Sequence, residues 1–286
     1  MRKHEMEIEI SAPASKVWKV LTTAEGIAAW FAPGASVEPG AGGKMTISWG
    51  EGMEVISRIA IWKPERHRQI ATDRPEPAPP SVIDYFIEGR GGATVLRLVH
   101  SGFGASADFD AEYESTGYGW PIFMKLLKHG AERGIDSCRN VTIMRMLSES
   151  PETAWEKLVA QAAGEMQGGV ERHRDSKGHC AIEFPSQRSA MLSLFCDGCG
   201  GATAVTVMWL LYDVSAKDAD AVRDRWTALL GPRVRTGGCY VSIFLTTLPS
   251  TSVSRKSRPC GGTSAAASRQ DDCRIIGLKT DDRAVR

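Results

Sequence analysis

The chain has 286 residues, which is enough for two modest domains that each bury a core. Its hydrophobic share of 42% and charged share of 24% are those of an ordinary globular protein. A net charge of +1 provides no basic surface for nucleic acid, and no apolar run reaches the ~20 residues that span a bilayer, so we expect neither nucleic-acid nor membrane partners. The seven cysteines are irregularly spaced and no apolar signal region opens the chain, so we expect reduced thiols and a cytoplasmic location.

The first half begins with short strand and helix patterns. Residues 7–10 predict a strand, and Pro13 suits the first turn of a helix with Val17 and Leu21 on its apolar face. Residues 25–31 predict a second short helix. Between residues 42 and 100, alternating apolar residues and turn signals predict a series of antiparallel strands.

A long helix follows these strands. An apolar stripe recurs at alternating spacings of four and three and places six residues on one face: Phe109, Tyr113, Thr116, Trp120, Phe123 and Leu127. Pro121 predicts a kink rather than a break, because the stripe continues in phase beyond it. A sheet with one apolar face buries it by curling around such a helix, so the predicted fold class is α+β.

The second half repeats the first. Trp18, Gly91-Gly92 and Trp120 correspond in order to Trp155, Gly200-Gly201 and Trp226. The repeat is shorter, by enough for the second helix or about two strands. We therefore predict three parts: a complete domain over residues 1–135, a reduced second copy over residues 139–231, and a flexible, disordered tail over residues 232–286.

Several motifs of the first half resemble one family. They are Ala12-Pro13, Val17-Trp18, Leu21, Ala29-Trp30-Phe31, Gly42-Gly43-Lys44-Met45, residues 96–104 and Gly119-Trp120-Pro121-Ile122-Phe123. This set is similar to bacterial proteins that resemble the C-terminal domain of the activator of the ninety-kilodalton heat-shock protein ATPase. That family belongs to the START-like, or SRPBCC, superfamily with the helix-grip fold. The resemblance implies a cavity between the curved sheet and the long helix, which binds apolar small molecules in the superfamily and performs cyclase or hydrolase chemistry in some members.

The candidate ligand-binding residues are aromatic, with one histidine at the inner end of the strand over residues 94–100. They are Trp30, Trp49, Tyr85, His100, Phe103, Tyr113, Trp120 and Phe123. The alternative for the aromatic residues is plain core packing. Tyr85, Tyr113 and Trp120 are favoured as contacts because a buried hydroxyl or indole N–H needs a partner. For His100 the alternatives are a ligand contact, a general base, or a structural role in the following loop.

The cysteines do not predict a metal site. Asp197-Gly198 between Cys196 and Cys199 predicts a hairpin turn, which would place the two thiols opposite each other. With His179 and Cys180, a zinc site is the alternative to free thiols, but a single C-x-x-C pair is a weak signal. We therefore expect no metal and no cofactor.

The leading functional hypothesis is non-enzymatic binding of an apolar small molecule in the first domain's cavity. One alternative is a cochaperone-like module in the stress response, whose partner is a chaperone or another protein. The other is an enzyme of cyclase or hydrolase type acting on a hydrophobic substrate. The enzyme would need His100 within reach of a carboxylate, with Asp84 and Glu112 as the candidates.

Overall fold

The computed structural model describes residues 1–50, 53–177, 179–199 and 202–231. The tail predicted over residues 232–286 lies outside the described residues. No helix in the described part of the chain is both long and apolar enough to cross a membrane.

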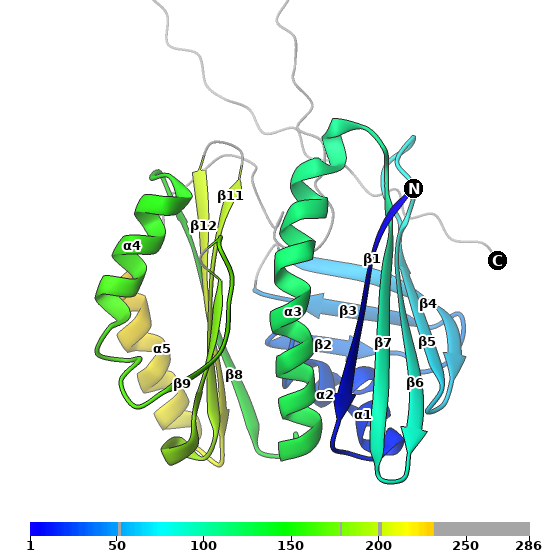
Figure 1. The fold of residues 1–286 in the computed structure, drawn as a ribbon, viewed down its shortest axis with the longest axis horizontal. Coiled ribbons are helices and arrows are strands. Elements are labelled where there is room, and N and C mark those ends of the chain that lie inside the picture. Colours follow the sequence, from blue (N-terminus) through cyan, green and yellow to red (C-terminus); the bar gives the residue numbers. More distant parts are fainter. Residues whose placement is uncertain (51–52, 178, 200–201, 232–286) are drawn as a thin grey trace, which may run out of the picture. The chain divides into compact units, whose positions relative to one another are not determined.

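The first half forms an antiparallel sheet whose strand order is β1-β7-β6-β5-β4-β3-β2. Two short helices follow the first strand, and a long helix follows the last (Figure 1). The elements are β1 (Arg2–Ile10), α1 (Ala14–Thr22), α2 (Ala24–Ala28), β2 (Gly34–Val37), β3 (Lys44–Ser48), β4 (Glu54–Lys63), β5 (His67–Thr72), β6 (Ser81–Arg90), β7 (Ala93–Phe103) and α3 (Asp110–Arg133).

The helix α3 is continuous through Pro121, as the phase of its stripe predicts. It is buried on more than the predicted face. Thr116, Trp120 and Phe123 of the stripe are buried, and Ile122 and Met124, which the stripe does not include, are buried too. The helix therefore packs against more than one layer.

The second half forms a smaller antiparallel sheet in the order β8-β12-β11-β10-β9. Its elements are β8 (Cys138–Leu147), α4 (Pro151–Ala162), β9 (Val170–Arg174), β10 (Cys180–Phe184), β11 (Ala190–Cys199), β12 (Ala202–Tyr212) and α5 (Ala216–Leu230). In the described residues it lacks a counterpart of α2 and has two fewer strands between its first helix and its last hairpin. The predicted fold class, an α+β helix-grip domain in tandem with a reduced second copy, is confirmed.

The second sheet contributes to two cores because its strands alternate. Phe195 and Met208 join the core of the first sheet and α3, and the ring of Phe195 stacks on Phe123 with centroids 5.4 Å apart. Leu194 and Val207, one residue away in each strand, join a separate core with α4 and α5, the two helices that line the other face (Figure 1). The helix α3 is thus covered by both copies.

The hairpin predicted at Asp197-Gly198 is wrong. The strand β11 continues through both residues, and Asp197 pairs with Ala204 while Gly198 pairs with Thr203. Pairing with β12 outweighs the local turn preference of Asp-Gly, because the strand there extends an already formed ladder. Cys196 and Cys199 lie along one strand rather than opposite each other.

Candidate functional site

A small cavity lies between the inner face of the first sheet and the region of α2. Its volume is about 10 Å³, which is room for about one water molecule. Strands β3 to β6, the helix α2 and the segment after it supply its lining: Ile27, Trp30, Phe31, Met45, Ile47, Ser57, Arg68, Ile70, Ile83 and Tyr85. The cavity is almost entirely apolar, and no residue of α3 lines it directly.

One charged side chain lies in this apolar lining. Arg68 is only 3% exposed, and its Nη2 donates to the sulfur of Met45 at 2.8 Å, a weak acceptor. Its guanidinium carbon lies 5.4 Å from the centroid of the Tyr85 ring. Burial lowers the pKa of Arg68 to about 10 and raises the pKa of Tyr85 to about 12, so at neutral pH the arginine is charged and the tyrosine is not.

Half of the predicted ligand-binding residues form a cluster next to the cavity. Phe31 lies at the centre, with ring centroids 5.0 Å from Trp30, 5.4 Å from Trp49, 6.2 Å from Trp120 and 4.8 Å from Phe123. Of the predicted residues, only Trp30 and Tyr85 line the cavity itself. The assignment of the eight residues to a ligand stays a prediction.

The remaining predicted residues, His100, Phe103 and Tyr113, lie around His4, where β1, β7 and α3 meet. The ring of His4 stacks on Tyr113 at 4.1 Å and meets the edge of Phe103 at 5.4 Å. His100 lies 4.5 Å from Phe103 between ring centroids. This second group is not part of the cavity lining, but it adjoins the cluster around Phe31 through His100 and Trp120, whose ring centroids are 5.7 Å apart.

Both ring nitrogens of His100 have partners. The indole Nε1 of Trp120 donates to Nδ1 at 3.0 Å, and the distance from Nε2 to the hydroxyl of Ser81 is 2.8 Å. Since an indole N–H only donates, Nδ1 accepts, and the proton of the neutral ring is on Nε2 and donated to Ser81. Burial, with smaller effects of His4 and Arg74, lowers the pKa of His100 to about 3. This geometry is that of a neutral structural histidine.

Neither carboxylate that the enzyme alternative requires pairs with His100 in the described structure. Asp84 projects from the outer side of β6, where its Oδ1 lies 2.7 Å from His67 and accepts from Gln69 at 2.8 Å. Glu112 forms a buried ion pair with Arg74. An acid–base pair centred on His100 is therefore not formed by these groups.

Three residues of the zinc alternative face different cores, and the side chain of the fourth, Cys199, lies outside the described part of the structure. Cys180 and Cys196 lie in the core with α4 and α5, and the thiol of Cys196 donates to the carbonyl of Pro151 at 3.2 Å. His179 lies on the other side of the sheet, with its ring centroid 5.6 Å from that of Phe195. Burial raises the pKa of Cys196 to about 12 and disfavours the thiolate that binds metals.

His179 instead lies between two carboxylates. Its Nδ1 is 2.8 Å from Asp175 and its Nε2 is 3.2 Å from Asp197. Burial alone would lower the pKa of His179, but the two carboxylates outweigh burial and raise it to about 9. The imidazolium form is therefore present at neutral pH and links the β9–β10 connection to β11.

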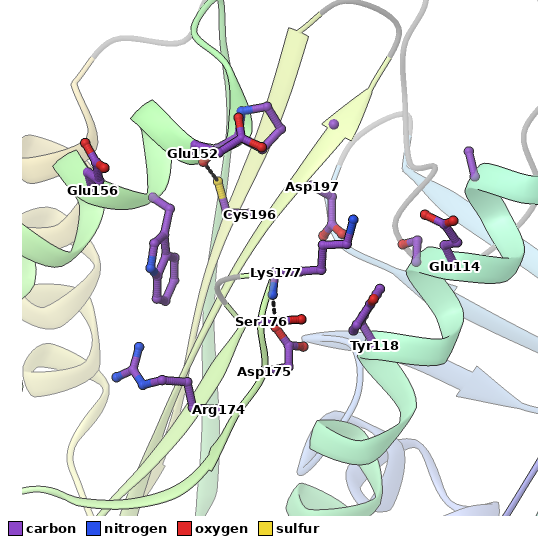
Figure 2. Close-up of a pocket in the computed structure, with 15 residues that line it drawn as sticks. Glu114, Tyr118, Glu152, Glu156, Arg174, Asp175, Ser176, Lys177, Cys196 and Asp197 are labelled. Atoms are coloured by element: carbon purple, nitrogen blue, oxygen red, sulfur yellow. Dashed lines mark hydrogen bonds between the residues drawn. The ribbon is translucent and has the colours of Figure 1, made fainter.

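A larger groove of about 500 Å³ opens beside this cluster (Figure 2). Residues of α3, α4, the β9–β10 connection and β11 line it, and acidic and basic side chains are mixed along it. Figure 2 shows Tyr118 of α3 on one side and Glu152 of α4 on the other, with Lys177 between them. The ammonium of Lys177 lies 5.6 Å from the centroid of the Tyr118 ring.

The comparisons with known proteins agree with the resemblance in the sequence. Residues 11–132 match the family model described as Activator of Hsp90 ATPase homolog 1-like protein. This part of the chain resembles that family and has its START-like fold. The curated proteins include no match to the chain.

Solved structures are similar to parts of the chain. Protein MLL2253 from Mesorhizobium loti has 25% identity and a TM-score of 0.41, covering 45% of this chain and 95% of its own. The Aha1 dimer from Colwellia psychrerythraea has 20% identity and a TM-score of 0.40, covering 46% of this chain and 97% of its own. DynU16, from the dynemicin biosynthetic locus, has 16% identity and a TM-score of 0.40, covering 80% of this chain and 96% of its own.

Sequence reasoning missed Arg68 as a cavity residue. The signal was present, because Arg68 precedes Ile70 by two positions in β5 and so shares its face. A charged residue at such an inward position stands out from the apolar pattern.

Proposed function

We propose that the START-like domain binds an apolar small molecule at the cavity beneath its sheet, without catalysing a reaction on it. The observation that supports this proposal best is the lining. Ligand sites are typically apolar and aromatic with a few converging polar groups. Here Trp30, Phe31 and Tyr85 supply aromatic surface, and Ser57 and Arg68 supply polar groups.

Binding requires the lining to move apart, because the volume of about 10 Å³ holds no organic ligand. We infer a closed state without ligand and an expanded state with ligand. The gain from burying an apolar ligand must then exceed the cost of expansion, which lowers the observed affinity.

The alternatives have less support. A cochaperone-like role would need an exposed apolar patch. The large apolar side chains that the described residues expose are Met1 at the start of the chain, Ile56 on β4 and Val170 on β9. They do not form one docking patch. For the enzyme, the paired partners of His100 leave that group without a carboxylate to act with.

A blocking substitution tests the proposal. Ile83→Phe fills the cavity and should abolish binding of the neutral fluorescent probe N-phenyl-1-naphthylamine, which brightens in apolar surroundings. Ile143→Phe is the control, because Ile143 is equally buried at 4% but lies in the second sheet. Both changes overpack a core at a cost of about 1–3 kcal/mol, so destabilisation alone affects both equally. Equal probe binding by both variants, or none by the unaltered protein, would contradict the proposal.

A further inference from the structure

Two arginines are buried in the first domain, and among the described residues a carboxylate pairs with only one of them. Arg74 has a side chain that is 3% exposed, and it is paired with Glu112, whose side chain is 1% exposed. Arg68 is also 3% exposed, but no carboxylate among the described residues pairs with it. Its Nε has no hydrogen-bond partner in that part of the chain. The Nε of Arg74 has none either, so the difference between the two is the carboxylate.

Burying a guanidinium without a counter-ion is costly. Arginine is almost never fully buried unless it is paired, since removal from water must be offset by charge attraction and hydrogen bonds. The groups that Arg68 does contact, the Met45 sulfur and the Tyr85 ring, carry no negative charge at neutral pH. Methionine would fill a similar volume there without the desolvation penalty. The charge therefore requires an explanation other than the stability of the ligand-free fold.

The position of Arg68 supplies that explanation. It lines the cavity, beside Ser57 and Tyr85 and opposite Trp30 and Phe31. Its planar fork of N–H donors suits two-point contact with a carboxylate. An anion that entered with an apolar body would provide the missing counter-charge, while the body would contact the apolar lining.

We propose that Arg68 is an anion-binding residue, and that the ligand of this cavity is an apolar molecule carrying one carboxylate, which pairs with the Arg68 guanidinium. This inference rests on the proposed function and narrows it from apolar ligands in general to apolar monocarboxylates. Tyr85, whose ring lies beside the guanidinium, sets one wall of the headgroup site.

The test uses matched probes on the full chain, titrated by calorimetry and by tryptophan fluorescence. Octanoate is compared with octanamide, and 2-naphthoate with 2-naphthamide, so that each pair differs in the charge of its headgroup. The unaltered protein should bind each carboxylate about tenfold or more tightly than its amide, the size expected for a hydrogen bond to a charged group. Arg68→Met should reduce that preference to about twofold or less while binding of the amides is retained.

A control variant and a stability measurement complete the design. Arg97→Met removes an arginine that is 40% exposed on the same sheet, and it should keep the full preference for carboxylates. Arg68→Met should raise the thermal midpoint of the ligand-free protein, because it removes an unpaired buried charge. A fall of several degrees would show that the guanidinium supports the fold itself and would overturn the proposal.

The outcomes separate this inference from the function on which it rests. If amides and carboxylates bind equally to the unaltered protein, the cavity binds apolar ligands but the role of Arg68 is wrong. If acetate stabilises the protein as well as octanoate does, the site takes small anions and the proposed ligand class is wrong. If none of the four probes nor N-phenyl-1-naphthylamine binds, the proposed function itself fails.

Discussion

The buried His100 should make the stability of the protein depend on pH in a way that can be calculated. Its pKa is about 3 in the folded chain, against an ordinary value of 6.5. Between these values the unfolded chain binds a proton that the folded chain does not. Stability from this site is therefore fully present above the unfolded pKa and is lost as the pH falls.

The magnitude follows from the two pKa values. At about pH 7.5 the ring is neutral in both states and proton binding removes almost no stability, whereas at about pH 5 the unfolded ring is nearly all protonated. Each pH unit below the unfolded pKa of 6.5 costs about 1.4 kcal/mol of stability, so about 2 kcal/mol is lost between the two conditions.

The assay is urea unfolding followed by tryptophan fluorescence, for the unaltered protein and for His100→Gln and His100→Asn. The variants do not titrate at this position, and other titrating groups largely cancel when each variant is compared with the unaltered protein. The free-energy advantage of the unaltered protein over a variant should shrink by about 2 kcal/mol from pH 7.5 to pH 5. A difference that stays constant with pH would refute the neutral, doubly bonded histidine.

Three further predictions concern other parts of the fold. Trp120→Phe should cost about 1–3 kcal/mol in urea unfolding by leaving Nδ1 of His100 without a donor, beyond the cost of Trp226→Phe, whose indole N–H has no partner in the described residues. His179→Gln should remove stability that is fully present below pH 6.5 and is lost as the pH rises through about 9, so unfolding curves of variant and unaltered protein should converge at high pH. A chain ending at residue 135 should fold but self-associate in light scattering, because it bares the side of α3 that Phe195 covers; a clean monomer would contradict this.

The repeat and the helix stripe made much of the fold predictable. A repeat with conserved order of strand, helix, hairpin and helix requires two similar domains, and the phase of the stripe across Pro121 required one helix. The sequence did not predict that α3 is also buried on a second side, which carries Ile122 and Met124. Periodicity shows that a face is apolar, but it does not show which distant sheet will cover it.

The site was less predictable because aromatic residues serve packing and binding alike. Trp30 and Tyr85 line the cavity, whereas Phe103 and Tyr113 pack around His4 outside its lining. No local pattern separates these pairs, since both lie on the buried sides of their elements. The exception to the pattern was more informative: Arg68, a charge on an apolar strand face, marks the cavity better than any aromatic residue does.

The arrangement of the layers also determines which side of the cavity is able to open. The helix α3 is held by both halves: Trp120 donates to His100 of β7 at 3.0 Å, and Arg133 pairs with Asp213, which follows β12, at 2.7 Å. The cavity wall formed by α2 and the segment after it has a smaller link, in which Asn140 of β8 donates to the carbonyl of Ala28 at 2.9 Å. We therefore expect the α2 side, rather than α3, to move when a ligand enters.

Hydrogen exchange should be faster in residues 24–31 than in the middle of α3. Asn140→Ala should make exchange in residues 24–31 faster still and raise the rate of probe binding. Equal protection of the two segments, or an Asn140→Ala variant with unchanged binding rate, would place the opening elsewhere.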